Sequence, residues 1–153
     1  MVLCACAEGM ERIQKGDETV RTLCRYLFVF VFGAAAYGFL EMVCRGKTHW
    51  SMLLAGGTAF LFLYCLHKTM QPVGRLMRCL IGCGMITCME LLIGWIVNCK
   101  MGLCVWDYSG VPWNLLGQIC PKYSALWFLL CLPGDWLCAQ ISAAWQKDQL
   151  CEK

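Results

Sequence analysis

The sequence predicts an all-α membrane protein with about four transmembrane helices, arranged as two hairpins, and an irregular re-entrant or interfacial stretch between spans three and four. Hydrophobic residues make up 59% of the 153 residues and charged residues only 15%, whereas soluble domains carry about 25% charged residues. Apolar runs recur at the length of about 20 residues that a helix needs to cross the hydrocarbon core. We therefore expect one transmembrane domain over residues 23–146, between a polar arm (1–22) and a short tail (147–153).

Composition argues against several classes of function. The net charge of +3 is small and scattered, unlike the basic patch of a nucleic-acid-binding protein. Most of the 14 cysteines lie in or beside apolar runs, where Cys acts as a small hydrophobe, and their spacing is not that of a zinc site. Phosphate-loop and hydrolase motifs are missing from the sequence. We expect no nucleic acid, metal or cofactor, and an enzyme is disfavoured but left open.

The first hairpin is predicted over residues 26–44 and 48–67. Glu41 is the only charged residue in the first run, and the second run has none. Gly56 and Gly57 mark a place where the two helices can approach closely. The arm before this hairpin lacks the apolar core of a cleavable signal, so we expect span one to remain as an anchor.

The second hairpin is predicted over residues 79–99 and 123–146, separated by the irregular stretch 101–122. Glu90 and Asp135 are the only charged residues in these two spans. Pro133-Gly134-Asp135 is a turn signal, at which the last helix could kink, break or end. The sequence leaves these three outcomes open.

Lysine and arginine counts predict the orientation. With the N-terminus in the cytoplasm, nine of these residues fall on the cytoplasmic side and four outside, as the positive-inside rule requires. We therefore expect both termini in the cytoplasm. Gly33 precedes Glu41 by eight residues, as Gly82 precedes Glu90, which indicates a weak parallel repeat of the two hairpins.

The two glutamates of the odd-numbered spans are candidates for chemistry. Glu41 lies four residues before Arg45, close enough on a helix to pair with it, either as an interfacial ion pair or as part of a functional site. Glu90 lies deeper and has no basic residue within a turn. Burial favours the neutral form of a carboxyl group, so Glu90 could exchange a proton or bind a cation, pack as a protonated donor, or meet Arg45.

The irregular stretch is the third candidate. Irregular backbone survives beside a bilayer only where protein or trapped water satisfies its polar groups. Its polar side chains could cap the elements that meet there, bind a substrate, or partner Arg45. The candidate substrate- or ion-binding residues are thus Glu41, Arg45, Glu90, Asp107, Tyr108, Ser109 and Asn114.

Several motifs occur together in one order. They are Tyr37-Gly38-Phe39-Leu40-Glu41, Thr48-His49-Trp50-Ser51-Met52, Glu90, Trp106-Asp107-Tyr108-Ser109, Pro112-x-Asn114-x-x-Gly117-x-Ile119-Cys120 and Trp127. Over roughly residues 25–130 the chain resembles the bacterial CmpB-like family described as Putative ABC-transporter type IV. The resemblance implies a small multi-spanning protein of the bacterial cell membrane, without specifying a substrate.

We therefore expect a transport component with a polar site in the outer half of the membrane. Four spans are few for a complete pathway, so the chain would act as a homo-oligomer or with partner transporter subunits, surrounded by membrane lipid. One alternative is an intramembrane enzyme that uses Glu90 and Asp107 as acid and base on a lipid-linked substrate. The other is a structural or regulatory membrane subunit.

Overall fold

The computed structural model describes residues 2–151, and side chains over 16–147. Its helices are α1 (Val2–Arg45), α2 (Trp50–Thr69), α3 (Arg75–Gly94), the π-helix η1 (Trp95–Lys100) and α4 (Pro121–Cys151). Within this part of the chain, four segments are long and apolar enough to cross a membrane: Gly16–Arg45, Trp50–Thr69, Arg75–Lys100 and Pro121–Lys147. The predicted all-α fold with four long apolar helices is confirmed.

The polar arm is helical and continuous with the first span, since α1 begins at Val2. Residues 8–21 contain good helix formers such as Glu, Arg, Gln and Lys, and no proline precedes Pro72, so nothing in the sequence ends the helix before Arg45. Residue 1 and residues 152–153, the extremes of the predicted arm and tail, lie outside the described residues.

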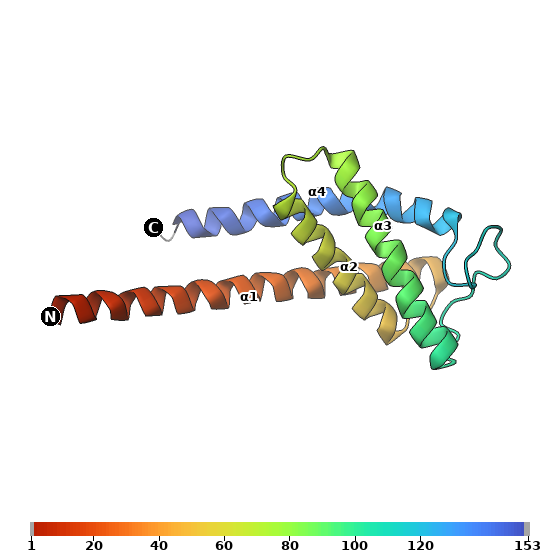
Figure 1. Cartoon of the computed structure of the whole chain (residues 1–153), viewed down its shortest axis with the longest axis horizontal. Coiled ribbons are helices and arrows are strands. Elements are labelled where there is room, and N and C mark those ends of the chain that lie inside the picture. The colour runs from red at the N-terminus through yellow and green to blue at the C-terminus, as the bar shows by residue number, and fades with distance from the viewer. Residues whose placement is uncertain (1, 152–153) are drawn as a thin grey trace.

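The helices form two hairpins, one from α1 and α2 and one from α3 and α4 (Figure 1). Both ends of the chain lie at one end of the molecule, which we call the terminal end, and residues 101–120 lie at the opposite end, the loop end (Figure 1). At the terminal end, α1 and α4 project beyond α2 and α3 (Figure 1).

Close helix contacts depend on glycine. A side chain at Gly56 would collide with Tyr37, and one at Gly57 would collide with Phe30. The close contact of α1 with α2 therefore requires glycine at both positions. The buried core behind this contact is Val29, Leu63, Tyr64, Cys79, Ile86, Cys131 and Cys138. The cysteines described in it are free thiols, consistent with their predicted role as small hydrophobes.

Helix α4 continues through the Pro-Gly-Asp sequence, with Pro133 inside it. A proline within a helix removes one backbone hydrogen bond, and the helix here is supported from α3, because Arg75 Nη2 donates to the Leu132 carbonyl at 2.6 Å. The helix therefore neither breaks nor ends at this turn signal, which excludes two of the three outcomes that the sequence left open.

Candidate functional site

Glu90 on α3 is held by two neutral donors from distant parts of the chain. Its side chain is buried, with 7% of the residue exposed. The Tyr108 hydroxyl donates to Oε1 at 2.9 Å and Trp127 Nε1 donates to Oε2 at 2.8 Å. One carboxyl group thus joins α3, the loop and α4. The alternative pairing of Glu90 with Arg45 is wrong, because Arg45 pairs with Glu41 instead.

A small central cavity adjoins Glu90. It has a volume of about 40 Å³ and is lined from all four long helices and the loop by Tyr37, Met52, Ala55, Gly56, Ala59, Ile86, Met89, Glu90, Ile93, Trp106 and Trp127. Glu90 is the only carboxyl group among these residues. A volume of this size holds one or two water-sized species, and apart from Glu90 the lining is mostly apolar.

The predicted ion pair of Glu41 and Arg45 is confirmed. Arg45 Nη1 donates to Glu41 Oε1 at 2.7 Å, and the Thr48 hydroxyl donates to Oε2 at 2.8 Å. Arg45 Nη2 donates to the Val105 carbonyl at 2.8 Å. The Arg45 side chain therefore binds the backbone of the loop and not the side chain of Asp107 or Asn114. This pair fastens the end of α1 to the loop.

A polar cleft opens beside this ion pair at the loop end. Its volume is about 190 Å³, and its lining is Glu41, Arg45, Lys47, Thr48, His49, Leu103, Cys104 and Val105. Tyr37 lies one helical turn before Glu41 and within electrostatic range of both Glu41 and Glu90. Tyr37 lines the central cavity and Glu41 lines the loop-end cleft, so residues one helical turn apart on α1 border the two spaces.

The other polar residues of the loop bind the loop itself. Asp107 is exposed and accepts hydrogen bonds from the backbone and the hydroxyl of Ser109, at 2.8 and 2.6 Å, and these bonds hold the pKa of its carboxyl group below the usual value. Asn114 donates to the carbonyls of Ser109 and Val111 and accepts from the Gly117 amide. These contacts match the capping role that the sequence allowed.

Tyr108 is the one residue of the four in this stretch that reaches Glu90. Burial, followed by the charge of the nearby Glu90, raises the pKa of its phenol above the ordinary value. The phenol therefore keeps its proton and acts as a hydrogen-bond donor. The seven candidate residues thus form three groups: Glu90 with Tyr108, Glu41 with Arg45, and Asp107 with Ser109 and Asn114.

Sequence reasoning missed the side chains that fix the loop on α3. Asn98 accepts from the Val105 amide at 2.7 Å and donates to the Trp106 carbonyl and to Gln118 Oε1 at 2.9 and 2.8 Å. A side chain at Gly94 would collide with Gln118 and Trp106. Asn98 is the only amide side chain in residues 79–99, and this isolated polar residue in an apolar span is the sequence feature that could have indicated its role.

A second polar cluster, also missed, lies around Asp135 on α4. Arg78 donates to its two oxygens at 3.1 and 3.0 Å, and His67 Nδ1 lies 2.9 Å from Oδ1. Arg75 adds a longer ion pair at 3.7 Å. The side chain of His67 is buried. This cluster joins α2, α3 and α4.

Four long apolar helices that bury carboxyl groups among them define a multi-spanning helical membrane protein. The family described as Putative ABC-transporter type IV matches residues 13–147, and the chain belongs to this family. The resemblance drawn from the sequence motifs is thereby confirmed. No curated protein and no solved structure matches the chain.

Proposed function

We propose that the protein is a transport component of a bacterial cell membrane in which Glu90 binds a proton or a small cation. The observation that carries this proposal is a buried carboxyl group that faces a cavity and has only neutral hydrogen-bond donors. An ionisable group within a membrane is costly and is typically retained for function.

The chemistry of the partners supports exchange at Glu90. The Tyr108 hydroxyl and the Trp127 indole both donate, so an ionised Glu90 accepts two hydrogen bonds. When Glu90 takes up a proton, its oxygens still have lone pairs for these donors. No ion pair has to break for the charge to change, and the cavity offers space for the incoming species.

Access would come from the loop-end cleft. Glu41 and Arg45 line that cleft, and Tyr37, one helical turn before Glu41, lines the cavity beside Glu90. We propose that this end faces the cell exterior, so that the site occupies the outer half of the membrane. Rotation of Tyr37 would then connect the two spaces.

The size of the spaces limits what one chain can bind. Pockets for drug-sized ligands span about 300–1,000 Å³, whereas the cavity and the cleft measure about 40 and 190 Å³. A larger substrate would need a surface formed with other chains. We therefore propose that the protein works as a homo-oligomer or with partner transporter subunits.

Flux through reconstituted protein tests the proposal. Proteoliposomes carrying a pH-sensitive or a sodium-sensitive dye should report proton or Na⁺ movement under an imposed membrane potential, and Glu90→Gln should abolish it. Glu18→Gln is the matched control, because Glu18 is an exposed glutamate near the start of the first span. Flux that survives Glu90→Gln in folded protein would contradict the proposal, and covalent turnover of a lipid substrate would favour the enzyme alternative.

The orientation has its own test. Cys104 is exposed and lines the loop-end cleft, so an impermeant maleimide added to intact cells should label it, while Cys151 should stay unlabelled until the membrane is opened. A variant that retains only one of these cysteines identifies the labelled position. External labelling of Cys151 would mean an odd number of crossings and would overturn the four-span orientation.

A further inference from the structure

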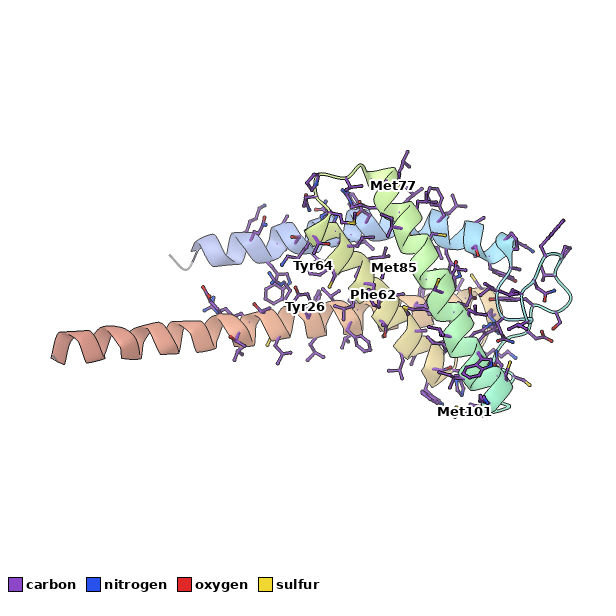
Figure 2. All side chains as sticks on the ribbon, in the orientation of Figure 1. Tyr26, Phe62, Tyr64, Met77, Met85 and Met101 are labelled. Atoms are coloured by element: carbon purple, nitrogen blue, oxygen red, sulfur yellow. The ribbon has the colours of Figure 1, made fainter. Side chains whose placement is uncertain are left out.

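Near the C-terminal end of α2, two basic side chains from different helices flank the ring of Tyr26. The Arg25 guanidinium lies 5.5 Å from the ring centroid and the Lys68 ammonium lies 5.9 Å from it. The same ring packs edge-on against Tyr64 of α2, with centroids 6.0 Å apart. Figure 2 shows the two tyrosines together between α1 and α4. Two cations and two phenols are therefore gathered where α1, α2 and α4 meet.

Two hydrogen-bond donors in this group have no acceptor. The side chain of Tyr64 is fully buried, and its hydroxyl has no hydrogen-bond partner; nor has the buried Nε of Arg25. Ser142 of α4 is the nearby polar side chain, but it does not reach hydrogen-bond geometry with the hydroxyl. Buried polar groups are nearly always paired, so these two donors indicate an acceptor that the side chains of residues 16–147 do not supply.

The two cations also lack a carboxylate. Within the described side chains, three basic residues near this group have one, because Arg21 pairs with Asp17, and Arg75 and Arg78 pair with Asp135. Neither Arg25 nor Lys68 forms such a pair there. The group thus has two positive charges, two unsatisfied donors and no counterion.

We propose that Arg25, Lys68 and Tyr64 bind the phosphate of an anionic lipid headgroup. Phosphate oxygens accept hydrogen bonds from guanidinium, ammonium and phenol groups and supply the missing negative charge. Lys68 lies one residue from the end of α2, at the membrane boundary expected for headgroups, and basic sites between helices on the cytoplasmic side recognise such lipids. Lys68 is exposed and Arg25 half-buried, so both long side chains can move to admit the phosphate.

This site is independent of the proposed transport function, because none of its three residues lines the cavity beside Glu90. A soluble phosphate compound presents the same oxygens as a lipid headgroup. The test therefore compares dioleoyl phosphatidylglycerol, dioleoyl phosphatidylcholine and sodium phosphate as additions to the full chain in dodecyl maltoside micelles. The thermal unfolding midpoint and native mass spectrometry report binding.

Phosphatidylglycerol at about 100 times its dissociation constant should raise the midpoint by roughly 5 °C, with one lipid retained in the mass spectrum. Phosphatidylcholine and sodium phosphate should raise it much less. Arg25→Gln and Lys68→Gln should each remove most of the shift. Lys147→Gln, which removes an exposed charge from the same end of α4, should keep it. An equal shift from both lipids would overturn the site, and a full shift from sodium phosphate would overturn its assignment to a lipid.

Tyr64→Phe distinguishes a ligand site from a packing site. Because its hydroxyl has no partner among the described side chains, the variant should have an unchanged or higher midpoint without lipid and a smaller shift with phosphatidylglycerol. A lower midpoint without lipid, together with a full lipid shift, would contradict the proposal. This readout remains decisive if Arg25→Gln fails to fold.

Discussion

Two buried carboxyl groups in this protein have opposite surroundings. Glu90 and Asp135 are exposed to nearly the same extent, 7% and 6%. Asp135 is met by Arg78, His67 and, at longer range, Arg75, whereas Glu90 is met by a phenol and an indole. The two carboxyl groups therefore do not differ in burial. They differ in the charge of their partners, which are cationic for Asp135 and neutral for Glu90.

The difference separates a structural role from an exchangeable site. Asp135 neutralises Arg78 inside the bundle, so protonation of Asp135 would leave a buried guanidinium without its counterion. Glu90 pairs with no cation, so a change in its charge leaves no buried positive charge without a counterion. On this comparison Asp135 holds α2, α3 and α4 together, while Glu90 is the group that we propose to gain or lose a proton.

Asp135→Asn should have the largest effect. The amide keeps the shape but removes the charge, and breaking a buried ion pair costs about 3–5 kcal/mol. The yield of folded protein and the unfolding midpoint in detergent should both fall steeply. Adding Arg78→Met should restore much of the loss, since the uncompensated charge is then gone. A small effect of Asp135→Asn alone would remove the contrast with Glu90.

Gly94→Ala should have an intermediate effect. Its methyl group would collide with Gln118 and Trp106, and overpacking of this kind costs about 1–3 kcal/mol. Displacing these residues should also move Tyr108 away from Glu90 and reduce flux. Gly84→Ala is the control, because nothing lies within 4 Å of the added methyl group. Equal midpoints for the two variants would mean that the loop does not pack closely on α3.

Tyr108→Phe should have a smaller effect, about 1 kcal/mol for one hydrogen bond. It should also change the response to alkali. The folded protein holds the Tyr108 proton more tightly than the unfolded chain, so this contribution to stability is complete below the unfolded pKa of about 10 and is lost as pH rises further. Unfolding measured from pH 8 to 11 should show a shallower loss in Tyr108→Phe. Identical slopes would contradict the buried, Glu90-bound phenol.

The sequence could predict features that depend on neighbours along the chain. Spans follow from apolar runs, and the Glu41–Arg45 pair follows from a spacing of four residues on one helix. The partners of Glu90 are 18 and 37 residues away, where helical periodicity carries no information. Asp135 was hidden for a related reason: Pro-Gly-Asp reads locally as a turn, and its partners His67 and Arg78 lie on other helices.

The loop shows a limit of a different kind. Asp107, Ser109 and Asn114 suit both a turn and a ligand set, because short polar side chains bind their own backbone as readily as a substrate. Their contacts here are to the loop itself. Only the placement of Tyr108 against α3, fixed by Asn98 and Gly94, connects the loop to the buried carboxyl group.

Glu90→Gln should have the smallest effect on stability, because the amide oxygen still accepts a hydrogen bond and no cation loses its partner. The most direct measurement is the infrared difference spectrum of the membrane-embedded protein between two pH values, compared with that of Glu90→Gln. We predict a carboxyl band of a buried, protonated group that changes with pH in the native protein, persists in Asp135→Asn combined with Arg78→Met, and disappears in Glu90→Gln. A band unaffected by Glu90→Gln, or lost with Asp135 instead, would contradict the assignment of Glu90 as the exchangeable site.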